Sequence, residues 1–215
     1  MAISNYSELK TAIAAWMARS DLTSNLDDFI DLCEARVSYG GQAPYESEPI
    51  RILGTEQANE SLTISSQTTA LPTGFLEARS FYLDNSTNDP LDYFSPDRFW
   101  EANAANDTGT PEIYTIQGTN IVVAPSPDVT YTGKLSYFKK MDALSDSATT
   151  NWLITNYPNV YLYGSLFEGA LYVKDYNEAD RWFALYKSAI DGLVDQDKTS
   201  RHSGSTLSVK VDYVP

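Results

Sequence analysis

Hydrophobic residues recur every three or four positions near both ends of the chain, the spacing that places them on one face of an α-helix. The first such stretch runs from Asn5 to Arg19, where Asn5 and Glu8 have the spacing of a helix-capping box. A second stretch covers residues 26–37 and ends at Gly40-Gly41, since glycine readily adopts the left-handed conformation that closes a helix. Both stretches predict amphipathic helices.

Two further helices are predicted after residue 150. Pro158 suits the first turn of a helix, because an amide hydrogen at that position has no partner within the helix and proline lacks it. Apolar residues then recur from Val160 to Leu171, and a last stretch runs from Ala179 to Leu193 at nearly heptad spacing. The short break between these two stretches predicts an antiparallel helical hairpin. Asn151-Trp-Leu-Ile is interpreted as a short turn that precedes the hairpin.

The middle of the chain, from Tyr45 to Met141, has short segments separated by Pro, Gly, Asn and Asp, which is typical of strands and turns. Gly118-Thr119 lies between two of these segments and predicts a hairpin. Ser95 before Pro96 has the pattern of a capped helix start, so one short helix is expected among the strands. The predicted strands are Glu48 to Leu53, Ser61 to Ser65, Glu77 to Leu83, Glu112 to Gln117, Asn120 to Val123 and Tyr131 to Phe138.

The predicted fold class is α+β, with an antiparallel four-helix bundle from both chain ends, a β-rich insertion in the middle and an extended C-terminal strand. The expected divisions are 1–44 for the first two helices, 45–145 for the insertion, 146–198 for the last two helices, and 199–215 for a flexible linker with the strand. Apolar and polar residues alternate in that strand, which pairs either with the chain's own insertion or with a neighbour's sheet. The candidate interface residues there are Leu207, Val209, Val211 and Tyr213.

Length and charge narrow the classes of function. The 215 residues suit one large domain or one domain with an insertion. A formal net charge of −14 argues against a surface that binds nucleic-acid phosphates or anionic membranes. No apolar run reaches the roughly 20 residues of a membrane-spanning helix, and the N-terminus lacks a secretory signal pattern, so synthesis in a cytoplasm is expected. Aromatic residues make up 13% of the chain, a supply suited to protein interfaces.

No motif predicts catalysis, a metal site or a cofactor. His202 is the one histidine and has no cysteine or carboxylate at ligand spacing, so a solvated residue is expected. Cys33 lies on the apolar face of its predicted helix and is expected to be buried and unreactive. Asp27, Asp28 and Asp31 are interpreted as a solvated helix face. A hydrolase that uses two of the 29 acidic residues stays open as a distant alternative, because no motif places such a pair.

Eight short motifs, taken in their order along the chain, resemble the head-to-tail adaptor (connector) proteins of tailed bacteriophages, particularly those of short-tailed phages. They are Tyr6-Ser-Glu-Leu-Lys, Phe29-Ile-Asp-Leu-Cys-Glu-Ala-Arg36, Leu71-Pro-Thr-Gly-Phe-Leu-Glu77, Pro111-Glu-Ile-Tyr-Thr-Ile116, Ala124-Pro-Ser-Pro127, Asn151-Trp-Leu, Tyr161-Leu-Tyr-Gly-Ser-Leu-Phe-Glu168 and Ala179-Asp-Arg-Trp-Phe183. The resemblance departs at Tyr39-Gly-Gly-Gln-Ala-Pro-Tyr, where the family often carries more basic residues, and after Ser205.

The resemblance implies a structural virion protein without enzymatic activity, made in the host cytoplasm and located in the neck between capsid and tail. Its implied partners are the portal protein, the tail tube or nozzle protein, and further copies of itself in a ring of twelve, with no membrane. DNA would pass through the ring without specific binding, so Asp27, Asp28 and Asp31 are also candidate residues of an acidic channel. The alternative is a carbohydrate- or receptor-binding module of a phage tail, suggested by aromatic and acidic residues in the β-rich middle.

Overall fold

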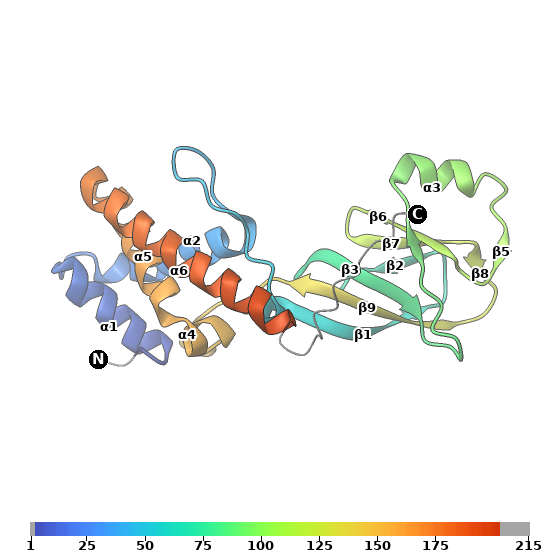
Figure 1. The fold of residues 1–215 in the computed structure, drawn as a ribbon, viewed down its shortest axis with the longest axis horizontal. Coiled ribbons are helices and arrows are strands. Elements are labelled where there is room, and N and C mark those ends of the chain that lie inside the picture. The colour runs from blue at the N-terminus through green and yellow to red at the C-terminus, as the bar shows by residue number, and fades with distance from the viewer. Residues whose placement is uncertain (1–2, 203–215) are drawn as a thin grey trace, which may run out of the picture. The chain divides into compact units, whose positions relative to one another are not determined.

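A computed structural model of the chain describes residues 3–202 and shows a mixed α and β protein. The chain divides into two compact units (Figure 1). Within the described residues, a helical unit combines residues 3–54 with residues 142–202, and a β unit consists of residues 55–141. Helices from both ends of the described chain therefore belong to one unit, and the β-rich middle of the chain forms the other.

Residues 45–54 belong to the helical unit, although the sequence predicts that the insertion begins at residue 45. The predicted strand from Glu48 to Leu53 does not form. Ile50 and Ile52 are buried instead, and the Ile50 amide donates a 2.9 Å hydrogen bond to the carbonyl of Val37. These two isoleucines hold the segment on the helices because their burial removes apolar surface from water.

The helical unit is built around one central helix. The element α5 contacts each of the other four α-helices of the unit within the described residues, whereas the sequence predicts four helices in an antiparallel bundle. Asn151 caps a short helix where a turn is predicted, because its side chain accepts a hydrogen bond from the Ile154 amide at 3.0 Å. The helices are α1 (Tyr6–Met17), α2 (Leu26–Tyr39), α4 (Trp152–Asn156), α5 (Pro158–Tyr172) and α6 (Tyr176–His202), with a 3₁₀ turn at Thr23–Asn25.

Three of these helices have the ends that the sequence predicts. The Asn5 side chain accepts from the Glu8 amide at 3.0 Å and so caps α1. Gly40 closes α2 with a positive φ of 80°, and Pro158 lies in the first turn of α5. Local capping chemistry therefore determines these boundaries before any tertiary contact is considered.

Helix α6 continues beyond the predicted end of its helix and includes residues 199–202, which the sequence assigns to a linker. Side chains of the last turns bond back along the helix: Thr199 donates to the Asp195 carbonyl at 2.9 Å, and Arg201 lies 2.7 Å from the Asp197 carboxylate. An ion pair at this four-residue spacing stabilises a helix, and Ser and Thr hydroxyls find acceptors one turn earlier. The predicted C-terminal strand of Leu207 to Tyr213 lies outside the described residues.

The β unit contains a three-stranded sheet in the order β1-β9-β3, a four-stranded sheet in the order β2-β7-β6-β4, and the short pair β5-β8. The predicted hairpin across Gly118-Thr119 is confirmed, since β6 and β7 pair antiparallel on either side of it. The predicted short helix is confirmed as α3 (Pro96–Ala102). The strands are β1 (Glu56–Ile64), β2 (Thr68–Ala70), β3 (Phe75–Leu83), β4 (Asp92–Tyr93), β5 (Thr108–Gly109), β6 (Ile113–Gln117), β7 (Asn120–Ala124), β8 (Ser126–Pro127) and β9 (Tyr131–Lys139), with a 3₁₀ turn at Leu53–Thr55 before them.

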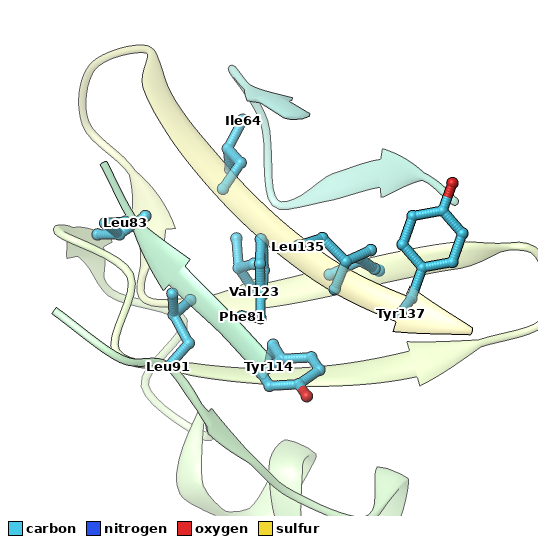
Figure 2. Packing of buried hydrophobic residues seen from close by; sticks show 9 residues of the cluster. Ile64, Phe81, Leu83, Leu91, Tyr114, Val123, Leu135 and Tyr137 are labelled. Carbon is cyan, nitrogen blue, oxygen red and sulfur yellow. The ribbon is translucent and has the colours of Figure 1, made fainter. Parts of the chain in front are cut away.

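The two larger sheets share one hydrophobic core (Figure 2). Leu135 of β9 and Phe81 of β3 pack there with Val123 of β7, so both sheets contribute side chains. Strand β7 buries both of its faces, because Val122 and Ala124 point to the opposite side and pack with Phe99 of α3. The alternation of side chains along a strand explains how one strand serves two clusters.

Candidate interaction surface

The predicted acidic residues of α2 lie on its solvent-exposed face. Asp27, Asp28 and Asp31 are all exposed. The Lys10 amine of α1 lies 2.7 Å from the Asp27 carboxylate, and this hydrogen bond holds the pKa of Asp27 below its usual value. The charge of Asp27 is therefore partly balanced within the unit.

A buried carboxylate fixes the inner face of α2. Glu34 accepts hydrogen bonds from the Leu144 amide at 2.8 Å and from the Tyr161 hydroxyl at 2.9 Å. The Asn151 amide group lies 2.6 Å from the same hydroxyl, so the residue that caps α4 also joins this network. Burial raises the pKa of Tyr161 well above its usual value. These bonds connect α2, α4 and α5 and so determine which face of α2 points outward.

A second polar contact holds the end of α2 on α5. Arg36 forms a 2.9 Å ion pair with Glu168, and both side chains are largely buried. The same guanidinium donates to the Tyr45 carbonyl at 3.1 Å and lies 4.8 Å from the centre of the Phe167 ring. A guanidinium can satisfy all these partners at once because it is planar and has several donors. Both buried carboxylates, Glu34 and Glu168, are thus occupied by structural contacts.

Large apolar side chains are exposed chiefly on the helical unit. Three neighbouring aromatic residues, Trp16 of α1, Tyr163 of α5 and Trp182 of α6, form what is here named the tryptophan cluster. The Trp16 ring centre lies 5.7 Å from that of Trp182 and 6.3 Å from that of Tyr163, and Trp16 remains 52% exposed. The other exposed large apolar residues of this unit are Leu32, Tyr39, Leu53, Trp152, Tyr172, Tyr176 and Leu185, whereas the β unit exposes Tyr93, Trp100 and Val129.

Exposed tryptophan and tyrosine side chains of this kind are typical anchors of protein–protein interfaces. The sequence assigns Trp16 and Trp182 to the apolar faces of their helices but does not predict that Trp16 stays half exposed. No local signal reveals this, because the exposure of Trp16 depends on residues of α5 and α6 that lie far away in the sequence.

A shallow hollow of about 320 Å³ lies between α4, the end of α6 and the segment before β1. Trp152, Tyr157 and Leu193 supply apolar lining, and Asp197 is its one carboxylate. Asp197 accepts a 2.8 Å hydrogen bond from the Leu53 amide and pairs with Arg201. The single carboxylate of the hollow is therefore occupied by structural contacts, and its lining holds no pair of carboxylates for hydrolysis.

Residues with possible reactivity do not form a site. Cys33 is completely buried between α2 and α5, and burial raises the pKa of its thiol well above its usual value. Within residues 3–202, no group of three or more His, Cys, Asp and Glu side chains is placed to hold a metal ion. No helix in the described part of the chain is long and apolar enough to cross a membrane. The predicted interface residues Leu207, Val209, Val211 and Tyr213 lie outside that part.

Comparison with known protein families gives one match. The family model described as SU10 adaptor protein matches residues 4–210 of the chain. The match therefore extends across the helical unit and the β unit. No curated protein matches the chain.

Proposed function

Because the chain belongs to the SU10 adaptor protein family, we propose that it is the head-to-tail adaptor of a short-tailed bacteriophage. The family match over residues 4–210 carries this proposal. Phage adaptors are structural proteins that act with portal and tail components in the neck of the virion. The exposed aromatic residues of the helical unit support such a role, since an adaptor needs a surface for each partner.

The adaptor acts as a ring of twelve copies below the portal, to which it attaches the tail tube or nozzle. A ring needs heterologous contacts, in which one surface of a subunit binds a different surface of its neighbour. The ring closes when the rotation from each subunit to the next adds up to a full turn. We assign the tryptophan cluster to the portal contact because a few buried aromatic anchors supply most of the energy of an interface.

DNA passes through the ring without specific binding. The net charge of −14 supports this part of the proposal, because acidic walls repel phosphates and let the duplex slide. Asp28 and Asp31 are the candidate channel residues on α2, together with Asp27, whose charge Lys10 partly balances. The C-terminal residues Leu207, Val209, Val211 and Tyr213 form the candidate contact with the portal or with a neighbouring subunit.

Co-sedimentation with the purified portal ring from the same phage tests the role. The full chain is expected to pellet with the portal in a fixed ratio, and a chain that ends at Ser205 is expected to lose this binding. A full chain that stays in the supernatant at all concentrations would contradict the adaptor role. Retained binding by the shorter chain at unchanged affinity would contradict the C-terminal contact alone.

A matched pair of substitutions tests the tryptophan cluster. Trp16 and Trp100 are similarly exposed, at 52% and 46%, but they lie on different units. Trp16→Gln is expected to weaken portal binding roughly 30-fold or more, the effect of losing an interface anchor of about 2 kcal/mol, whereas Trp100→Gln leaves it unchanged. Urea unfolding of both variants checks that the helical unit still folds. Equal binding by the two variants would remove the cluster from the portal contact.

A carbohydrate- or receptor-binding module of a phage tail is the second candidate. The exposed Tyr93 and Trp100 of the β unit favour it, because sugar rings stack on exposed aromatic side chains. A glycan array with the full chain tests this candidate, and the absence of any bound glycan would leave the adaptor role as the one to pursue.

A further inference from the structure

Strand β1 is the outer strand of its sheet, and one of its edges has no partner strand within the described residues. Its inner edge pairs with β9 without interruption from Glu60 to Ile64. The opposite outer strand, β3, is different, because the Leu91 amide donates to the Phe81 carbonyl at 2.9 Å and the Leu83 amide to the Asp89 carbonyl at 2.8 Å. The outer edge of β1 is therefore the more open of the two edges of this sheet.

The Ser61 to Ile64 part of the β1 edge lacks the usual features that prevent pairing with another chain. Natural edge strands are protected by lysine, by proline, by a bulge or by short length. Strand β1 is nine residues long and contains no Lys, Arg or Pro. Its irregularity lies between Gln57 and Glu60, so the stretch from Glu60 to Ile64 keeps regular strand geometry.

The two faces of β1 differ in polarity. Ile64 is fully buried and points into the core shared by the two sheets (Figure 2), and Leu62 packs against the same core but is only partly buried. Ser61 and Thr63 alternate with them and are exposed. A strand that paired with this edge would need apolar residues beside Leu62 and polar residues beside Ser61 and Thr63.

Residues 207–213 have this pattern. Leu207, Val209, Val211 and Tyr213 alternate with Ser208, Lys210 and Asp212. If the four apolar side chains extended the core face next to Leu62, the three polar ones would lie on the exposed face next to Thr63. A register shifted by one residue would expose all four apolar side chains, so the pattern also selects the register.

We propose that residues 207–213 of one copy add as a further strand to the outer edge of β1 in a neighbouring copy. This inference rests on the proposed ring and names the partner of the C-terminal residues within it. A strand on one subunit and an edge on the next form a heterologous contact, the kind that a closed ring requires. Main-chain hydrogen bonds supply affinity in such an addition, and the alternating side chains supply specificity.

Cysteine cross-linking between two full-length copies bound to the portal ring tests the proposal. One copy carries Thr63→Cys on β1, and the other carries a single cysteine at one of positions 208 to 212. Both are mixed on the portal and treated with a short bismaleimide, and linked peptides are identified by mass spectrometry. Cys33 is buried and serves in the unsubstituted chain as the background. The matched control is Ser80→Cys, an exposed position on β3 at the other side of the same sheet.

Cross-links to position 63 are expected at every second one of positions 208 to 212. Ser208→Cys, Lys210→Cys or Asp212→Cys links to position 63, because directly opposed side chains on one face lie about 5 Å apart. Val209→Cys and Val211→Cys do not link to it, since their side chains lie on the core face, and none of the five links to position 80. Portal pelleting without any link to position 63, links without alternation, or equal links to position 80 would each overturn the strand addition but leave the adaptor role standing. Failure to pellet would overturn both.

Discussion

Replacing Gly164 by alanine is expected to destabilise the helical unit, although the same change in an ordinary helix stabilises it. Gly164 lies inside α5, where alanine has a helix propensity about 1 kcal/mol more favourable than that of glycine. A Cβ atom at Gly164 would overlap the Cys33 sulfur and approach the Tyr186 ring to 3.1 Å. Both neighbours are fully buried, so neither has space into which it can move.

The size of the effect follows from these two opposing contributions. Overpacking of a close-packed core costs about 1–3 kcal/mol, and a direct overlap with sulfur places Gly164→Ala near the upper value. After the gain in propensity, the free energy of unfolding is expected to fall by about 2 kcal/mol. Gly192→Ala in α6 is the matched control, because no atom lies within 4 Å of a Cβ placed there. That variant is expected to gain up to about 1 kcal/mol.

Urea unfolding followed by tryptophan fluorescence measures both variants, since Trp16, Trp152 and Trp182 all lie in the helical unit. The double variant Cys33→Ala with Gly164→Ala checks the cause, because removal of the sulfur should make the alanine at 164 far less harmful than it is in the parent chain. A Gly164→Ala variant as stable as Gly192→Ala would refute the reasoning. An unchanged penalty in the Cys33→Ala background would show that the sulfur is not its source.

Three further predictions concern polar contacts and the β core. Tyr161→Phe leaves Glu34 without one of its buried hydrogen bonds, so urea unfolding should show a loss of about 1–3 kcal/mol, and a loss below 0.5 kcal/mol would contradict the network. Asp27→Asn should lower stability at pH 7 by about 0.2–1 kcal/mol. Because the folded-state pKa of Asp27 is lowered, the stability that its charge contributes is lost as the pH falls through that pKa. The difference in the free energy of unfolding between the parent chain and Asp27→Asn should therefore shrink below pH 3.8. A difference that persists there would contradict the role of Lys10. Leu135→Ala in the core of the β unit should cost about 2–5 kcal/mol, measured by circular dichroism during urea unfolding, whereas a cost below 1 kcal/mol would place Leu135 outside the core.

Local chemistry explains why several elements could be predicted from the sequence. Asn5, Gly40 and Pro158 determine helix ends through the hydrogen bonds that they make or omit, and these depend only on residues within one turn. The hairpin across Gly118-Thr119 is equally local. The strands β4, β5 and β8 are two residues long and pair in parallel with distant segments, so no pattern within them predicts their existence.

The candidate interaction surface is harder to predict from the sequence than the fold is. The exposure of Asp28 and Asp31 follows from their position opposite the apolar face of α2. Trp16 occupies an apolar-face position of α1, yet it is half exposed although its ring lies beside the tilted rings of Tyr163 and Trp182. The predicted strand from Glu48 to Leu53 does not form, since burial of Ile50 and Ile52 against the helices outweighs their strand propensity.

The sequence by itself determined the four long helices, the hairpin across Gly118-Thr119, the acidic character of the chain and the lack of a catalytic motif, because these depend on composition and on spacing within a few residues. Only the tertiary structure decided that α5 is the central helix, that Glu34 and Glu168 are buried with partners, and that one edge of β1 has no partner strand among residues 3–202. Each of these depends on residues that are far apart in the chain and meet only after folding. The free energy of such contacts comes from burial and paired polar groups, which no single segment contains.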